Sequence, residues 1–153
     1  MEVLETAQVL PGARLSEVFA FFSDPANLAR ITPPELGFRI HGGAPRPLEA
    51  GSRIEYRIRW MGATLRWVTR ITRWDPPLEF QDAQEKGPYA LWIHTHRFRQ
   101  TEVGVEMGDR VEYRLPFGPL GRVAHRLGVR RQLERIFEYR RTAIAALFAG
   151  GGP

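Results

Sequence analysis

Apolar and polar residues alternate through the middle of the chain, from about residue 38 to residue 115. In the clearest stretch, arginine and glutamate residues alternate with the apolar or aromatic residues Ile54, Tyr56, Ile58 and Trp60. A period of two is typical of β-strands that bury one side and expose the other. Clusters of glycine and proline interrupt the alternation at intervals, so the pattern predicts an antiparallel meander of strands joined by turns.

A strand and two short helices are predicted before this region. Residues 3–9 predict a first strand, and apolar residues at helical spacing within residues 15–22 predict an amphipathic helix. Asp24 and Pro25 are typical of an N-cap followed by proline at the first helical position. They predict a second short helix over residues 26–31.

One long helix is predicted after the strands, from about Pro119 to about Phe148. Gly128 is the expected position of any kink. Arg140 has the spacing of the apolar side, so we expect its guanidinium to face inward. The apolar side consists of Leu120, Val123, Leu127, Leu133, Ile136, Phe137, Ile144 and Leu147.

This order of elements predicts an α+β fold, because the helices have to cover one face of an antiparallel sheet. We expect a curved sheet of about seven strands wrapped around the long C-terminal helix. A twisted sheet of this size curls, and the layer between it and a single helix then leaves room for an elongated cavity. We expect one domain over residues 1–149 and a frayed tail over residues 150–153.

Short motifs accompany this order of elements. They are Phe22-x-Asp24-Pro25-x-Asn27-Leu28, Ile31-Thr32-Pro33-Pro34, Trp74-x-Pro76-Pro77, Gln84-x-x-Gly87-Pro88-Tyr89-x-x-Trp92-x-His94-x-His96-x-Phe98 and Asp109-x-Val111-x-Tyr113. Over essentially the whole chain they resemble the SRPBCC superfamily, in particular its ligand-binding SRPBCC domain branch. The superfamily also contains START lipid-transfer domains, birch-pollen-allergen-like proteins and polyketide cyclases. The resemblance implies a helix-grip fold with a hydrophobic cavity, and it implies no particular reaction because carriers, sensors and enzymes share this scaffold.

Three polar residues are predicted to face the interior. His94 and His96 lie two residues apart on one strand, and Asp109 lies on the next. If the turn sets His96 opposite Asp109, the two side chains come within hydrogen-bond reach. Such a group either satisfies its own buried polar atoms and fixes the sheet register, contacts a ligand, or provides an acid/base pair.

Arg140 and a set of aromatic residues complete the predicted site. Arg140 either clamps a ligand carboxylate or forms an internal ion pair with Asp109 or Asp82. We expect no metal, although two histidines and an aspartate form one kind of metal triad, because no fourth ligand is apparent. The predicted ligand-binding residues are Tyr56, Trp67, Thr69, Trp92, His94, His96, Asp109, Tyr113, Phe137 and Arg140, with Trp60 and Tyr89 extending the aromatic wall.

Composition excludes some chemistry and adds little to the choice of partner. The 153 residues include no cysteine, which excludes disulfides, thiolate metal sites and cysteine nucleophiles. The net charge is +5, but the basic residues are spread through the chain among 17 acidic ones, so we expect no nucleic-acid partner. No apolar run is long enough to span a bilayer and Glu2 and Glu5 are unlike a signal peptide, so we expect a cytoplasmic location without stable membrane anchoring.

The sequence therefore favours a binding or carrier protein for a small hydrophobic molecule, aromatic, acyl or lipid-like, without a cofactor. The alternative is an enzyme of the cyclase or dehydratase type, in which His96 oriented by Asp109 acts as general base, with His94 as a further candidate. An interaction module would need an exposed apolar patch, which the pattern does not show. The ligand and the oligomeric state are not indicated.

Overall fold

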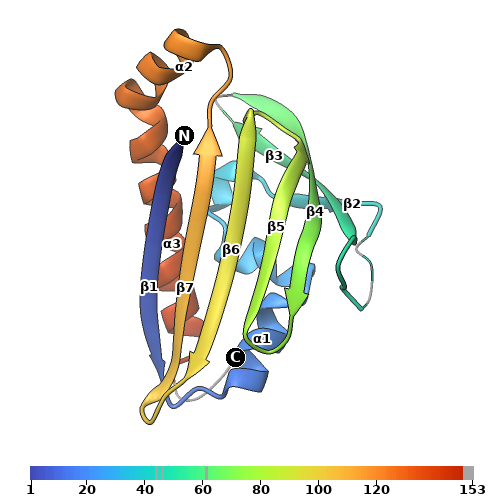
Figure 1. Cartoon of the computed structure of the whole chain (residues 1–153), viewed down its shortest axis with the longest axis vertical. Coiled ribbons are helices and arrows are strands. Elements are labelled where there is room, and N and C mark those ends of the chain that lie inside the picture. Colours follow the sequence, from blue (N-terminus) through green and yellow to red (C-terminus); the bar gives the residue numbers. More distant parts are fainter. Residues whose placement is uncertain (44, 46, 61, 150–153) are drawn as a thin grey trace.

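The structure, a computed structural model, contains one seven-stranded sheet with helices against one face (Figure 1). It describes residues 1–43, 45, 47–60 and 62–149, so the expected tail at residues 150–153 lies outside the described residues. Every neighbouring pair of strands is antiparallel, and the spatial order is β1-β7-β6-β5-β4-β3-β2. The strands are β1 (Glu2–Pro11), β2 (Arg39–His41), β3 (Arg53–Trp60), β4 (Ala63–Asp75), β5 (Glu79–Lys86), β6 (Leu91–Gln100) and β7 (Gly104–Arg114).

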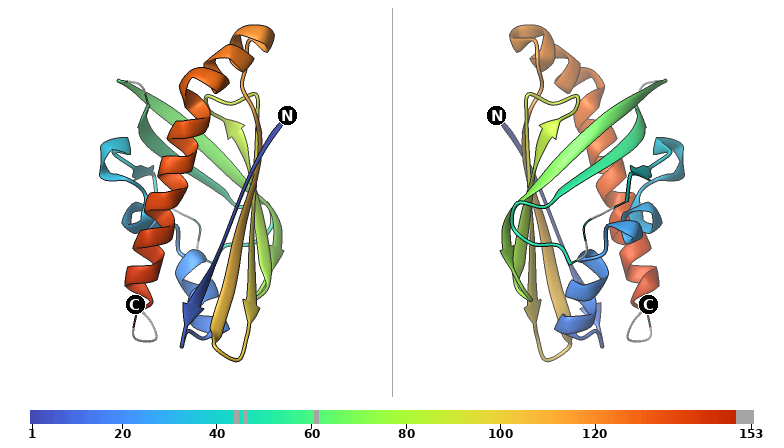
Figure 2. Two further views of the ribbon diagram at one scale, coloured as in Figure 1. Left: turned by 90° about the vertical axis from the view of Figure 1, so that its left-hand side faces the viewer. Right: turned by 90° about the vertical axis from the view of Figure 1, so that its right-hand side faces the viewer.

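The sheet bends where the pairing of β4 with β5 is irregular. Strand β4 pairs with β5 with register shifts at Val68/Thr69 and at Ile71/Arg73. Extra residues at such points bend a strand and increase its twist. Figure 2 shows the result: the strands curl around the space in which the long helix lies. The predicted curved antiparallel sheet is confirmed.

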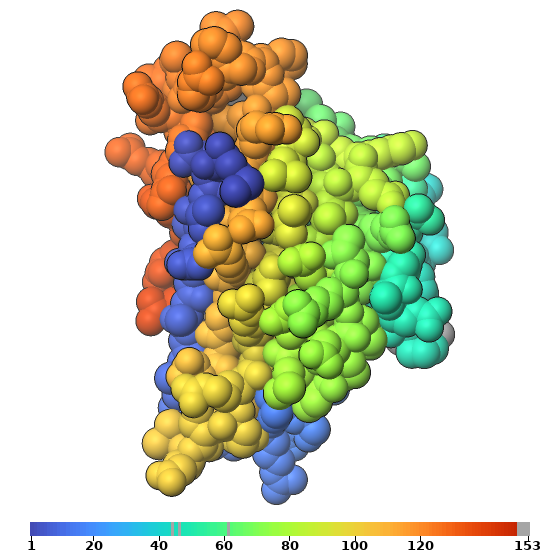
Figure 3. All heavy atoms as spheres, viewed as in Figure 1, coloured from blue at the N-terminus to red at the C-terminus, as the bar shows by residue number. Residues whose placement is uncertain are grey.

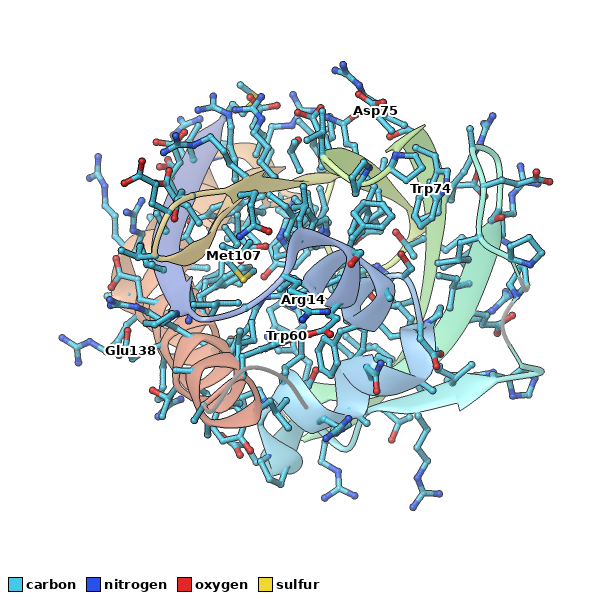
Figure 4. All side chains as sticks on the ribbon, turned by 90° about the horizontal axis from the view of Figure 1, so that it is seen from below. Arg14, Trp60, Trp74, Asp75, Met107 and Glu138 are labelled. Atoms are coloured by element: carbon cyan, nitrogen blue, oxygen red, sulfur yellow. The ribbon has the colours of Figure 1, made fainter. Side chains whose placement is uncertain are left out.

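The helices close the concave side of the sheet. The predicted N-cap is confirmed, since the Asp24 carboxylate accepts a hydrogen bond of 3.1 Å from the backbone N–H of Ala26. Seen from below (Figure 4), Met107 lies inside the enclosure, whereas Glu138 points outward. The helices are α1 (Leu15–Phe22), the 3₁₀ helices η1 (Pro25–Ile31) and η2 (Pro34–Leu36), α2 (Gly118–Ala124), the π-helical turn η3 (His125–Val129) and α3 (Arg130–Leu147).

The interior has two apolar clusters. The first surrounds α1 and includes Phe19, Phe22 and Phe98. The second lies between the sheet and the upper part of α3 and includes Trp67, Tyr113, Val111, Leu133 and Phe137. The strand residues of both clusters lie on the inward side of the sheet, as the period of two predicts, and the helices and loops contribute the other buried residues.

The apolar side predicted for the long helix is wrong in its first part. Leu120, Val123 and Leu127 are 75%, 52% and 83% exposed, whereas Leu133 is 4% exposed. The π-helical turn around Gly128 adds one residue to a turn and so rotates the helical face that precedes it. In addition, α2 projects beyond the ends of the strands (Figures 1 and 3). An exposed apolar surface therefore exists where the sequence pattern suggested none.

Candidate functional site

A cavity of about 190 Å³ lies between the concave face of the sheet and α3. Aliphatic and aromatic side chains from β3, β4 and β6 form one wall, and Leu133, Ile136 and Phe137 of α3 form another. Residues of η1 and the following turn line the cavity as well, including Leu28 and Ile31. The polar residues in the lining are Thr32, Thr69, Asp82, His94, His96 and Arg140.

Strand pairing brings most of these polar residues together. His96 pairs with Asp109 of β7, as expected, and His94 pairs with Asp82 of β5. Residues paired across an antiparallel sheet point to the same face, so two carboxylates flank the two imidazoles. Arg140 reaches this group from α3, on the opposite side of the interior.

Asp109 is the common acceptor of the group. Its Oδ1 atom lies 2.8 Å from His94 Nε2, 3.2 Å from His96 Nδ1 and 3.2 Å from Arg140 Nη2. Its Oδ2 atom accepts a longer hydrogen bond of 3.4 Å from Arg140 Nε. Arg140 thus forms the internal ion pair that was one of its two predicted roles.

Asp82 holds the other side of His96. Its Oδ2 atom lies 3.0 Å from His96 Nε2, and its Oδ1 atom accepts a hydrogen bond of 3.0 Å from the Thr69 hydroxyl. Both ring nitrogens of His96 therefore face carboxylates. The ring also stacks on Phe80 with 4.1 Å between centroids, while His94 packs edge-on against Phe137 at 5.6 Å. The histidine pair thereby links the two apolar clusters.

The carboxylates are held in their ionised form. Burial alone would raise the pKa of Asp109, but the charge of Arg140 and the hydrogen bonds from His94 and His96 hold that pKa well below its ordinary value. Burial likewise opposes ionisation of Asp82, and its hydrogen bond with His96 and the nearby imidazoles lower its pKa nevertheless.

The two histidines differ in pKa despite their proximity. Burial lowers the pKa of His96, but its hydrogen bonds with Asp109 and Asp82 outweigh burial and raise it. Burial and the neighbouring charge on His96 lower the pKa of His94, and Asp109 compensates only in part. These contacts therefore favour the protonated form at His96 over His94, and the neutral form at His94.

This difference changes the candidate for acid/base chemistry. His96, the predicted general base, has carboxylates at both nitrogens, and these raise its pKa and favour its protonated form. His94 uses Nε2 toward Asp109, and among the described residues no hydrogen bond to its Nδ1 is formed. A neutral imidazole oriented by a carboxylate at the cavity wall has the form of a general base, so His94 is the better candidate.

The other predicted site residues divide into two groups. Tyr56, Trp67, Thr69, Trp92, Phe137 and Arg140 line the cavity together with the two histidines. Asp109 lies behind the imidazoles and is not part of the lining. Tyr113 is fully buried away from the cavity, and its hydroxyl lies 2.7 Å from Nε2 of His125 in the π-helical turn. A role for any of these residues in ligand binding stays a prediction.

Asp82 is the residue that the sequence pattern placed least well. The sequence predicts it only as an alternative partner for Arg140, yet it contacts His96 and lines the cavity. The alternation of Phe80, Asp82 and Gln84 was the available signal, since these residues share one side of a strand.

Solved structures share this architecture, although no family model matches the chain and no curated protein is significantly similar to it in sequence. A protein from Rhodobacter sphaeroides is 18% identical, with a TM-score of 0.70 over 96% of this chain and 91% of its own. The allergen Ara h 8.0201 is 12% identical, with a TM-score of 0.61 over 94% of this chain and 98% of its own. The di-domain ARO/CYC protein StfQ from the steffimycin biosynthetic pathway is 12% identical, with a TM-score of 0.71 over 94% of this chain and 49% of its own.

The chain has the helix-grip fold. This is the fold implied by the resemblance to the SRPBCC superfamily, and at these identities the likeness concerns the fold alone. Within the described part of this helix-grip protein, no helix is long and apolar enough to cross a membrane.

Proposed function

We propose that the protein binds a small, mostly apolar molecule with one neutral polar group in the cavity. The cavity itself carries the proposal, because it combines an apolar lining with polar side chains at one wall. A cavity of about 150 Å³ in a protein interior admits benzene. The volume of about 190 Å³ therefore suits a molecule somewhat larger than benzene, with one ring or two fused rings, or a short acyl chain.

Aromatic side chains favour a flat ligand. Tyr56 and Trp67 are stacked, with 5.8 Å between ring centroids, and Trp92 meets Trp67 edge-on at 5.3 Å. Such rings offer a large, rigid apolar surface for a flat molecule. Trp67 Nε1 is also a buried donor that has no hydrogen-bond partner among the described residues. A ligand acceptor beside the indole would satisfy it.

The polar wall favours a neutral group over a carboxylate. Arg140 already pairs with Asp109 and is 7% exposed, so its charge is not free for an anionic ligand. The Asp82 carboxylate at the cavity wall would repel an anion. A hydroxyl or carbonyl group can instead form hydrogen bonds with His94 or Thr69.

Three probes that differ at one position test the proposal. 2-Naphthol, naphthalene and 2-naphthoate are titrated against the protein, and the fluorescence of the probe and of the cavity tryptophans is followed. We expect 2-naphthol to bind more tightly than naphthalene, because its hydroxyl meets the polar wall. We expect 2-naphthoate to bind most weakly. Failure of all three to bind at saturating concentration contradicts the proposal.

A matched pair of substitutions locates the binding. Ile136→Trp fills the cavity from α3 and is expected to abolish 2-naphthol binding, whereas Ile93→Trp adds the same ring to β6 outside the cavity lining and is expected to preserve it. Thermal unfolding monitored by circular dichroism checks that both variants fold. If both variants lose 2-naphthol binding equally, or if Ile136→Trp still binds it, then the probe does not bind in this cavity.

A further inference from the structure

Three potential metal ligands converge at the cavity wall. Asp82, His94 and His96 each offer an oxygen or nitrogen atom, and these atoms all lie within 4.8 Å of one another. All three residues line the cavity. We propose that they form a site for a divalent transition-metal ion of the Zn²⁺, Fe²⁺ and Co²⁺ class, with its open coordination positions facing the cavity.

The donor set defines the class of ion. Two imidazoles and one carboxylate suit transition metals, whereas Mg²⁺ and Ca²⁺ prefer oxygen ligands throughout. The chain has no cysteine, so thiolate coordination does not compete within it. Three protein ligands leave positions for water or a ligand, which is the arrangement of metal sites that bind or activate a molecule and not of closed structural sites.

The surroundings orient each donor. Histidines that bind metals usually donate their second N–H to a carboxylate or carbonyl group. Here Asp109 Oδ1 faces Nε2 of His94 and Nδ1 of His96, at 2.8 and 3.2 Å. The remaining nitrogens are His94 Nδ1 and His96 Nε2. The Thr69 hydroxyl fixes Oδ1 of Asp82 and leaves Oδ2 beside His96.

The distances require only a small adjustment. His96 Nε2 and Asp82 Oδ2 lie 3.0 Å apart. Bonds of about 2.0–2.2 Å place neighbouring ligand atoms roughly 3.0–3.5 Å from each other around a metal. No two of the group's ligand atoms are more than 4.8 Å apart, so a small side-chain rotation brings any wider pair into bonding range. The ion takes the position between His96 and Asp82 that is otherwise bridged by a proton.

This site is independent of the proposed apolar ligand. The cavity can bind a naphthalene probe in metal-free protein, and a metal can bind without any organic ligand. The two proposals are therefore separated by measuring 2-naphthol binding in the presence of EDTA, where failure of the metal site has no effect on the result.

Cobalt is a suitable probe because bound Co²⁺ absorbs in the visible range. The full chain, stripped of metal, is titrated with Co²⁺ alone, and stoichiometry is measured by elemental analysis after gel filtration. We expect one Co²⁺ per chain, displaced by Zn²⁺. Asp82→Asn, His94→Gln and His96→Gln should each weaken binding at least tenfold. His41→Gln changes an exposed histidine on β2 and should have no effect.

A milder variant covers the case in which loss of a ligand prevents folding. Thr69→Val keeps all three ligands and removes the hydrogen bond to Asp82, and we expect about 10- to 100-fold weaker Co²⁺ binding. The proposal is overturned if Co²⁺ does not bind at 0.1 mM (roughly the weak limit for a specific site). It is also overturned if Thr69→Val binds as the unmodified protein does, or if His41→Gln removes the signal.

Discussion

Replacing Arg140 by methionine removes the buried cation of the polar group and keeps most of the aliphatic stem. Arg140 and Asp109 are 7% and 6% exposed, so bulk water solvates the remaining charge poorly once its partner is lost. Breaking a buried ion pair by removing one member costs about 3–5 kcal/mol. Protonation of His94 offsets part of this loss, so we expect Arg140→Met to reduce the free energy of unfolding by about 3 kcal/mol. This is a large fraction of the roughly 5–15 kcal/mol that stabilises a typical domain.

Urea unfolding of metal-free protein at pH 7, followed by tryptophan fluorescence, measures the loss. Arg99→Met is the matched control, because Arg99 pairs with Glu106 at 2.7 Å on the surface, where its side chain is 69% exposed. We expect no measurable change in this variant.

A double-mutant cycle with Asp109→Asn isolates the pair. The double variant should be more stable than the sum of the two single losses predicts, by about 1–3 kcal/mol, because it leaves no uncompensated charge. If Arg140→Met lowers the free energy of unfolding by less than about 1 kcal/mol, and its effect adds to that of Asp109→Asn, then Arg140 does not form a stabilising pair with Asp109. It would then be free to bind an anionic ligand, contrary to the proposed neutral ligand.

Three further predictions concern packing, backbone conformation and one aromatic residue. Leu133→Ala should cost about 2–5 kcal/mol in urea unfolding and Leu127→Ala almost nothing, and similar losses would contradict the exposure of the first part of the long helix. Gly104 has a φ of 153° and a Cβ there would lie 2.0 Å from a backbone oxygen of β1, whereas at Gly108 the nearest such atom is 3.5 Å away. Gly104→Ala should therefore lower the melting temperature far more than Gly108→Ala, and equal shifts would refute the close approach of β1. Tyr113→Phe should cost about 0.5–1.5 kcal/mol and leave 2-naphthol affinity unchanged, so a weaker affinity would return Tyr113 to the site.

The fold was predictable because each element has a local signal. Alternation fixes which side of each strand is buried, and the Asp24–Pro25 pair marks the start of η1. The pairing of His96 with Asp109 followed from the short turn between β6 and β7, since a short connection determines the register. The inward position of Arg140 followed from helical spacing within α3.

The errors arise where a local pattern does not determine geometry. The π-helical turn adds a residue to a turn, so helical spacing counted from Leu133 back to Leu127 points to the wrong side. The position of Asp82 beside His96 depends on the register between β5 and β6, which periodicity alone does not reveal. The difference in pKa between the two imidazoles depends on short contacts among β5, β6, β7 and α3. These contacts cannot be predicted from the amino-acid composition or from the spacing of residues.

The free edges of the sheet have a consequence for how the molecule behaves at high concentration. Strand β2 at one edge is only three residues long and carries Arg39 and His41. At the other edge, Gln8 of β1 donates a hydrogen bond to the backbone carbonyl of Arg141 in α3, so the first strand is tied to the last helix. Long, bare edges are the usual template for aggregation between sheets. The short, charged β2 edge is therefore a poor template for another copy, and the ten residues of β1 are the edge along which a second sheet would pair.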